Sequence, residues 1–173
     1  QGDWSSDVCS SDLGHSFTPL CATTGTLLSL DAIQGIIATN PRDLTATIKA
    51  GTKIHAIGRP LWDAGLGLKN QGDIDRQAIA GAVGTGTHGT GPTLGSLSSE
   101  VTGFRLVTAD GGVIDCSPTS NREVWEGGRV SVGALGVMSE ITLSVRKAYR
   151  LRETNSVMPA EVCWRDQIGR AHV

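Results

Sequence analysis

The chain has 173 residues, with 15 lysines and arginines against 17 aspartates and glutamates and a formal net charge of −2. This near-neutral balance gives no electrostatic reason to expect nucleic acid binding, and no apolar run is long enough to span a membrane. Hydrophobic residues make up 39% of the chain, which fits one globular domain, and its 23 glycines are about twice the usual share of ~7%.

Both ends of the chain can be translated from one DNA segment read in opposite directions. Residues 7–13 can be encoded by GACGTGTGCTCTTCCGATCT plus one base, and the reverse complement encodes residues 168–173 and completes a codon for Gln167. The segment resembles a short-read sequencing adapter, and the resemblance extends over residues 2–6. We therefore expect residues 1–13 and 167–173 to be adapter-derived and the native N-terminus to be missing, so no targeting segment can be interpreted. A cytoplasmic location is favoured.

The first half of the native part mixes short strands with one helix. Residues 26–30 read as a strand, and residues 35–39 and 44–51 read as a hairpin around an Asn-Pro-Arg-Asp turn. Residues 53–64 predict an amphipathic helix, which Pro60 is expected to kink or break. Its inward positions are expected to be Ile54, Ile57, Leu61 and Trp62.

The second half continues with a second hairpin and a strong strand. We expect short helical pieces at residues 78–83 and 94–100, and a hairpin of residues 101–107 and 112–116. Residues 121–130 predict a helix capped by Asn121. Residues 137–145 predict a strand with one face formed by Ile141, Leu143 and Val145. The elements show no βαβ regularity and the hairpins imply antiparallel pairing, so the expected fold class is α+β.

A glycine-rich loop, GAVGTGTHGTG at residues 81–91, is the most informative segment. Glycine allows the main chain to approach a ligand closely, with successive amides directed at one anion. The loop holds no lysine, which suits a bound pyrophosphate better than a phosphate in transfer. Residues 84–89 match GxGxxG, but no strand precedes them and no long helix follows, which argues against a doubly wound dinucleotide fold. No Gly-Lys-Ser/Thr follows, which excludes a P-loop.

The cysteines of the native part do not form a recognisable site. Cys21, Cys116 and Cys163 are scattered along the chain without a CxxC pair. The spacing indicates neither a disulfide framework nor a zinc site, and we predict no metal.

Three motifs in order carry a family resemblance: GHSFTPL at residues 14–20, NQGDID at 70–75 leading into IAGAVGTGTHGTG at 79–91, and VGALGVMSEITL at 132–143. Together they resemble the FAD-binding (PCMH-type) domain of the vanillyl-alcohol-oxidase superfamily, and within it the D-arabinono- and L-gulono-1,4-lactone oxidase group. The resemblance implies a two-subdomain FAD-binding domain over residues 14–152, truncated at its N-terminus. Residues 153–166 would begin the connection to a substrate-binding cap domain that is missing.

The resemblance also implies the cofactor contacts. His15 takes the place of the histidine that carries FAD covalently through the flavin 8α carbon, a reasonable role for a nucleophilic neutral imidazole. His88 is expected either to order the loop by hydrogen bonding, which we favour, or to approach the substrate. The remaining expected contacts are Gly14, Ser16 and Phe17 beside the tether, Gly86, Thr87 and Gly89 along the flavin and pyrophosphate, Ala78 and Val83 nearby, and the backbone of Val137 on the adenine side.

The implied activity is oxidation of an alcohol carbon of a sugar-1,4-lactone, with hydride transfer to flavin N5 and reoxidation by oxygen or another acceptor. No catalytic base is assigned, because in the family that group lies largely in the cap domain, and the fragment itself is expected not to turn over. Two alternatives stay open. One is an alditol oxidase or lactone dehydrogenase with the same domain and a polyol or lactone substrate. The other is a nucleotide-binding module without redox chemistry.

Overall fold

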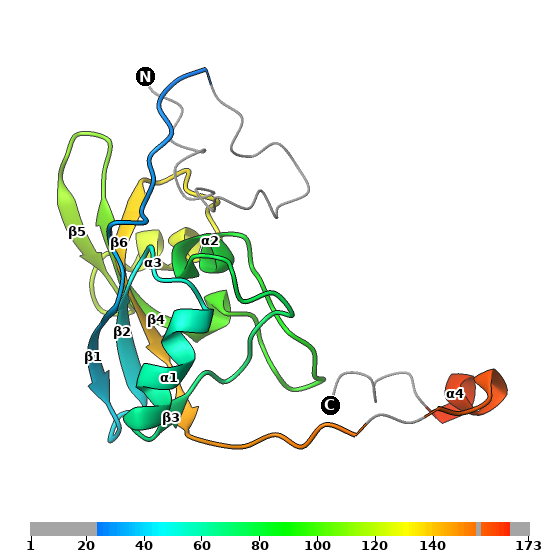
Figure 1. Cartoon of the computed structure of the whole chain (residues 1–173). Coiled ribbons are helices and arrows are strands. Elements are labelled where there is room, and N and C mark those ends of the chain that lie inside the picture. Colours follow the sequence, from blue (N-terminus) through cyan, green and yellow to red (C-terminus); the bar gives the residue numbers. More distant parts are fainter. Residues whose placement is uncertain (1–23, 155–156, 167–173) are drawn as a thin grey trace.

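The computed structural model describes residues 24–154 and 157–166. A five-stranded antiparallel sheet in the order β1-β2-β6-β4-β5 forms one layer, and α1 and α2 cover one of its faces (Figure 1). The strands are β1 (Ile36–Asn40), β2 (Thr45–Lys49), β4 (Val101–Val107), β5 (Val113–Cys116) and β6 (Val137–Ser144). The expected α+β class with antiparallel pairing is confirmed.

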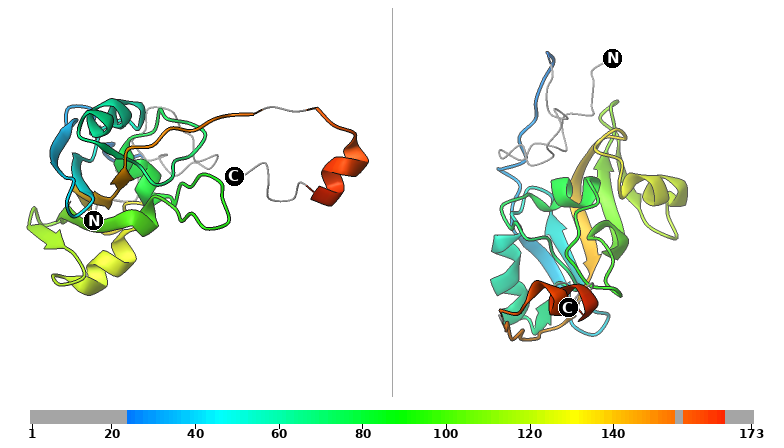
Figure 2. Two further views of the ribbon diagram at one scale, coloured as in Figure 1. Left: turned by 90° about the horizontal axis from the view of Figure 1, so that it is seen from below. Right: turned by 90° about the vertical axis from the view of Figure 1, so that its right-hand side faces the viewer.

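The helices are short, and a second sheet of two strands accompanies the five-stranded sheet. The helical segments are α1 (His55–Asp63), α2 (Ile79–Gly84), the 3₁₀ turn η2 (Ser98–Glu100), α3 (Arg122–Gly128) and α4 (Ala160–Asp166). Two short strands that the sequence pattern does not predict, β3 (Leu66–Gly67) and β7 (Arg146–Lys147), pair in a separate ladder. In Figure 1 and in the left view of Figure 2, α4 lies apart from the sheet and the other helices.

The core lies between the sheet and the two helices. Because side chains alternate across a strand, Ile48 of β2 and Ile141 of β6 face inward and are completely buried. They belong to one cluster with Ile57 of α1 and Val83 of α2. The cluster is almost entirely aliphatic, as expected from an aromatic content of 4%. Strand β6 lies at the centre of the sheet and confirms the predicted buried face at residues 141, 143 and 145.

Both predicted hairpins are present. In the first, the side chain of Asn40 accepts hydrogen bonds from the amides of Arg42 at 3.0 Å and Asp43 at 3.1 Å, which closes the turn. In the second, Asp110 accepts a hydrogen bond from the amide of Gly112 at 3.1 Å. The asparagine and aspartate at these turns therefore satisfy backbone donors that the ladders leave unpaired.

The opposite face of the sheet is polar. One row across four strands alternates in charge, from Lys49 through Glu140 and Arg105 to Asp115.

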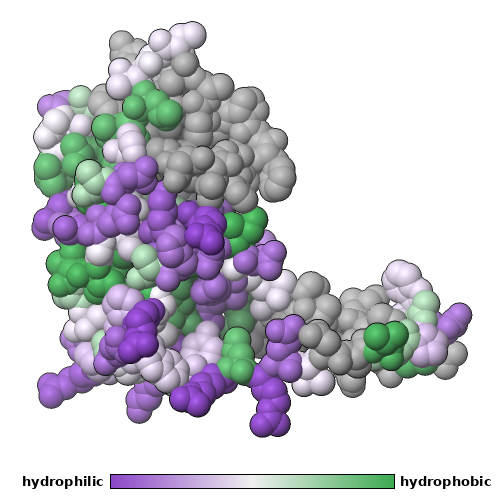
Figure 3. Space-filling model, in the orientation of Figure 1, coloured by the Kyte–Doolittle hydropathy of each residue, from purple (hydrophilic) through white to green (hydrophobic). Residues whose placement is uncertain are grey.

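Exposed hydrophobic side chains include Ile37 and Val113 on the two edge strands. In the space-filling view, green hydrophobic patches lie mainly on the left, where the sheet lies, and hydrophilic side chains cover much of the lower part (Figure 3).

Two expectations in the first half of the chain were wrong. Residues 26–30 form no strand, because no partner in the described part of the chain pairs with them and only Leu30 is buried. Trp62 faces outward with 42% of its surface exposed, because it falls one residue beyond the stripe of Ile54, Ile57 and Leu61. The helix passes through Pro60 without ending there.

Two expectations in the second half needed adjustment. Asn121 precedes α3, but it adopts a left-handed conformation (φ 48°, ψ 47°) and its side chain makes no capping hydrogen bond. The side-chain amide donates instead to the carbonyl of Asp115 at 2.9 Å, which ties the start of α3 to β5. The helix expected over residues 94–100 is reduced to the single turn η2. Across the described ranges, no helix has the length and apolar character needed to cross a membrane.

Candidate cofactor site

The glycine-rich loop begins at α2, a helix of small residues that is buried along its whole length. Ala78, just before it, is extended (φ −68°, ψ 146°) and forms an isolated bridge with Lys53. The first amides of α2 donate to the chain after β2, from Ile79 to the carbonyl of Thr52 at 2.9 Å and from Ala80 to that of Ala50 at 3.1 Å. The N-terminus of α2 is therefore already satisfied by protein and is fixed against the sheet.

The amides at the end of α2 are also used internally. Thr85 donates to Gly81 at 3.1 Å, Gly86 to Val83 at 3.1 Å and Thr87 to Ala82 at 2.9 Å. These bonds satisfy the last carbonyls of the helix, so these three amides are not directed at a ligand, contrary to our expectation for this part of the loop. No described residue accepts a hydrogen bond from the amides of residues 88–90. The donors available to an anion therefore lie later in the loop.

Gly89 lies where no side chain fits. A Cβ at this position would lie 2.1 Å from the carbonyl oxygen of Gln71 and 2.3 Å from Oδ1 of Asn70. Asn70 also donates to the carbonyl of Gly95 at 3.0 Å. Asn70 thus lies against Gly89 and bonds to the chain just after the loop. It belongs to the second motif, but the sequence analysis did not single it out as a site residue.

His88 is exposed at the tip of the loop. Its Nδ1 lies 2.7 Å from the carbonyl oxygen of Gly89. Because a carbonyl only accepts hydrogen bonds, Nδ1 carries the proton, and Nε2 is the acceptor in the neutral ring. The contact lies within the loop, and the loop-ordering role that we favoured for His88 stays a prediction.

The third motif meets the loop directly. Val132 donates its backbone N–H to the carbonyl of Gly84 at 3.1 Å, and a Cβ on Gly86 would lie 3.8 Å from Cγ1 of Val130. At the end of the turn Gly136 has φ +137°, and a Cβ there would lie 2.4 Å from the carbonyl oxygen of Val107. This close approach directs the chain into β6 at Val137, which is 7% exposed and pairs with β4.

The structure brings together only part of the predicted site. Gly86, Thr87 and Gly89 are half-buried on one loop, and Val137 follows the turn that contacts this loop. Val83 is fully buried, so its side chain packs in the core and only its backbone is near the loop. Four predicted residues lie outside the described residues: Gly14, His15, Ser16 and Phe17.

A sequence model of the FAD binding domain matches residues 12–117, which include the loop and strands β1 to β5 of the structure. The chain belongs to this family. The match starts before the described residues and therefore also covers the segment of the first motif.

Curated relatives of this FAD-binding domain are lactone-oxidising enzymes. L-gulono-1,4-lactone dehydrogenase of Mycobacterium tuberculosis is 39% identical over 138 residues, which are 80% of this chain and 32% of that protein. L-gulonolactone oxidase of Bos taurus is 32% identical, covering 82% of this chain and 32% of that protein. D-arabinono-1,4-lactone oxidase of Yarrowia lipolytica is 30% identical, and the match covers 88% of this chain and 30% of that protein. The FAD-binding domain thus spans about a third of the length of these relatives.

Two solved structures of distant sequence have the same fold. Xylooligosaccharide oxidase from Myceliophthora thermophila C1, in complex with xylobiose, superposes with a TM-score of 0.64 at 20% identity, covering 69% of this chain and 25% of that one. Alkyldihydroxyacetonephosphate synthase superposes with a TM-score of 0.61 at 20% identity, covering 69% and 22%. At this identity the likeness establishes the fold alone.

The residues present suit FAD. The amides of residues 88–90 have no partner among the described residues, and Gly89 among them lies where only backbone fits. Two cations outside the loop are paired within the protein, Lys69 with Glu100 at 2.7 Å and Arg76 with Asp75 at 3.5 Å. A long cofactor with a pyrophosphate can be held by such backbone donors without a lysine in the loop.

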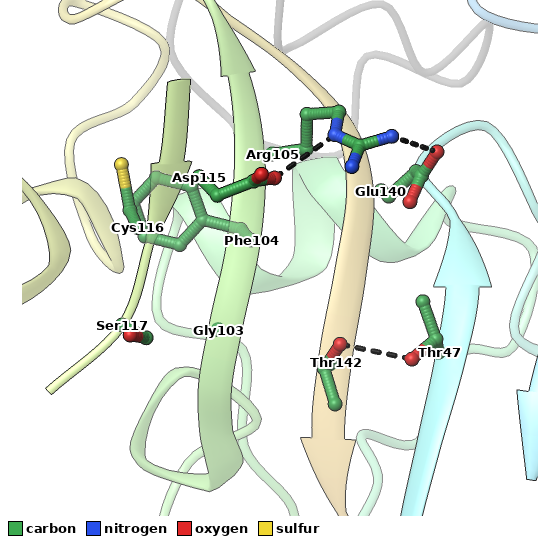
Figure 4. Close-up of a pocket in the computed structure, with 9 residues that line it drawn as sticks. All are labelled: Thr47, Gly103, Phe104, Arg105, Asp115, Cys116, Ser117, Glu140 and Thr142. Atoms are coloured by element: carbon green, nitrogen blue, oxygen red, sulfur yellow. Dashed lines mark hydrogen bonds and ion pairs between the residues drawn. The ribbon is translucent and has the colours of Figure 1, made fainter. Parts of the chain in front are cut away.

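A separate depression of about 350 Å³ lies beside strands β2, β4, β5 and β6 (Figure 4). Arg105 lies within it between Asp115 at 2.9 Å and Glu140 at 3.1 Å, and the hydrogen bond with Asp115, followed by the charges of both carboxylates, raises the pKa of the guanidinium. None of the predicted cofactor residues lines it. The depression therefore lies over the row of alternating charges on the polar face of the sheet, and we do not assign it to the cofactor site. Within the described residues, no cluster of three or more metal-ligating side chains occurs.

Proposed function

We propose that this chain is the cofactor-binding part of an FAD-dependent oxidoreductase that oxidises a sugar-1,4-lactone. The observation that carries the proposal is the 39% identity to a lactone dehydrogenase over 138 residues, which are 80% of this chain. The hydrogen bond from Val132 to Gly84 supports it, because it joins the glycine-rich loop and the third motif into one cradle. When bound, the flavin supplies a hydride acceptor for the alcohol carbon, while the hydroxyl proton goes to a base and the acceptor takes up two electrons.

The proposal includes a covalent bond between His15 and the 8α carbon of the flavin. His15 would hold the cofactor through this bond, with an imidazole nitrogen in place of one hydrogen of the 8α methyl group, and the flavin would supply the two-electron oxidising power that the bond requires. The family resemblance of residues 14–20 supports this step. The test compares the chain with His15→Ala after incubation with FAD, using flavin fluorescence in a denaturing gel. Fluorescence that migrates with the chain and is lost in the variant is expected; FAD released from both on denaturation would leave binding intact without the tether.

The substrate and the acceptor need the whole enzyme. We propose to express the full-length gene and to screen it with L-gulono- and D-arabinono-1,4-lactones and with alditols, using oxygen and an artificial acceptor in parallel. Turnover of a lactone is expected. A preference for alditols would contradict the lactone assignment. Turnover only with the artificial acceptor favours the second candidate, a lactone dehydrogenase, to which the relative from Mycobacterium tuberculosis points.

We also propose that residues 1–13 and 167–173 derive from adapter DNA. The agreement of both ends with one DNA segment in opposite orientations supports this origin. Reading the source gene across both junctions tests it. Gene sequence that continues unchanged through codons 13 and 167 would contradict it.

A further inference from the structure

The turn that contacts the glycine-rich loop begins with an arginine at the end of α3. Arg129 is the C-cap residue of α3. The next residue, Val130, is the side chain that a Cβ on Gly86 would meet at 3.8 Å. Val132, three residues after Arg129, donates to Gly84. Arg129 therefore lies at the start of the segment that contacts the glycine-rich loop.

Arg129 and Trp125 present two buried donors that the protein does not satisfy. The guanidinium carbon of Arg129 lies 4.2 Å from the centroid of the Trp125 ring, a cation–π distance. Nε of Arg129 and Nε1 of Trp125 are both buried and have no hydrogen-bond partner in the described part of the chain. Buried donors are nearly always paired in native proteins, and an orphan points to a group that binds there.

The charge of Arg129 is also unmatched. Among the described residues, no carboxylate forms an ion pair with Arg129, whereas Arg122 at the start of the same helix bonds to Glu126 at 2.8 Å. Arg129 is half-buried and Arg122 is exposed. A buried donor without a partner costs free energy, so an anion that accepts from Nε of Arg129 offsets a penalty that the fold otherwise carries.

We propose that Arg129 binds the pyrophosphate of FAD, with Trp125 holding the guanidinium in place. This inference rests on the proposed function, because it assumes that the cofactor is FAD. It assigns to the site a cation that the loop at residues 81–91 lacks. The planar guanidinium donates to two phosphate oxygens at once, while the amides at residues 88–90 remain available for the rest of the cofactor.

The test measures equilibrium dissociation constants of the 173-residue chain for FAD, ADP and riboflavin. Flavin fluorescence reports FAD and riboflavin, and calorimetry reports ADP. The first variant is Arg129→Gln, which keeps a polar side chain with the same first three carbons but removes the charge, and the second is Arg129→Lys, which keeps the charge. The third is Trp125→Phe, which keeps an aromatic ring but removes the indole donor. Arg122→Gln is the matched control, because it removes a cation from the same helix. Thermal unfolding of each variant is recorded beside the binding data.

Arg129→Gln is expected to weaken FAD and ADP binding by about tenfold or more, since a charge-assisted hydrogen bond is lost. Riboflavin, which carries no phosphate, should bind equally well to all variants, Arg129→Lys should recover part of the loss, and Arg122→Gln should bind like the parent. Equal FAD affinity in Arg129→Gln and the parent would overturn the inference and leave the proposed function intact. Equal losses for riboflavin and FAD would also overturn it, by showing a general structural role. A parent chain that binds none of the three ligands would overturn the proposed function as well.

Discussion

The backbone N–H of Val132 donates to the carbonyl of Gly84 at 3.1 Å, which joins the third motif to the glycine-rich loop. The contact unites two segments that are distant in sequence and that each follow a short helix. It fixes the end of α2 against the turn that leads into β6. A bond between two backbone groups therefore helps to set how the glycine-rich loop and the third motif lie relative to each other.

Gly89→Ala should disrupt the loop. The new Cβ would lie 2.1 Å from the carbonyl oxygen of Gln71, so the backbone must shift. We expect the free energy of unfolding to fall by more than about 1 kcal/mol and FAD affinity to fall by about tenfold. Urea unfolding and FAD fluorescence titration measure the two effects.

Gly58→Ala is the matched control for this loop substitution. A Cβ at Gly58, on the exposed side of α1, meets nothing within 4 Å. This change should stabilise the chain by about 1 kcal/mol through helix propensity and leave FAD binding unchanged. Equal FAD affinity in Gly89→Ala and Gly58→Ala would show that the loop tolerates a side chain.

Neighbouring glycines in α3 should respond in opposite directions. A Cβ on Gly128 would lie 2.5 Å from Cζ of Phe104, whereas a Cβ on Gly127 meets nothing within 4 Å. Gly128→Ala should cost about 1–3 kcal/mol by overpacking, and Gly127→Ala should stabilise the helix by about 1 kcal/mol. Urea unfolding of the two variants measures the difference. Stabilisation by both substitutions would mean that α3 does not pack on Phe104 as described.

Asp110 should titrate at unusually low pH. Hydrogen bonds from the Thr108 hydroxyl and then from the Gly112 amide lower the pKa of its carboxyl. A group whose pKa is lowered in the folded state stabilises it above the unfolded pKa of about 3.9 and loses that contribution as the pH falls through the folded pKa. Carboxyl NMR titration should therefore give a midpoint below the ordinary range, and Thr108→Val should move it upward. An identical midpoint in both proteins would contradict the assigned cause.

Cys116 should be protected in the folded chain. Its thiol is buried, and burial followed by the charge of Asp115 raises its pKa. Because the thiolate is the reactive form, a raised pKa and poor access both slow alkylation near pH 8. Peptide mapping after iodoacetamide treatment should show the Cys116 peptide unlabelled in buffer and labelled in urea. Labelling at the same rate in both conditions would show that β5 is open in solution.

Much of the fold could be predicted from local pattern. The alternation in residues 137–145 predicted β6 with its buried face, and the turn residues at Asn40 and Asp110 located both hairpins. The expected strand at residues 26–30 failed because a strand also needs a ladder partner, and local composition does not reveal one. The prediction that Trp62 faces inward was wrong. It relied on the hydrophobicity of tryptophan, although position 62 lies one residue beyond the buried face of the helix.

The sequence by itself determined the family, because each of the three motifs is a short run of neighbouring residues and the three follow one another in a specific order. It also determined the antiparallel α+β class, since hairpin turns and strand alternation act over a few residues. Only the tertiary structure decided which amides of the loop remain available, that Asn70 closes on Gly89, and that Arg129 lies over Trp125 beside the cradle. These relationships depend on how helices and strands pack after they form, and packing joins residues whose separation in the chain carries no local signal.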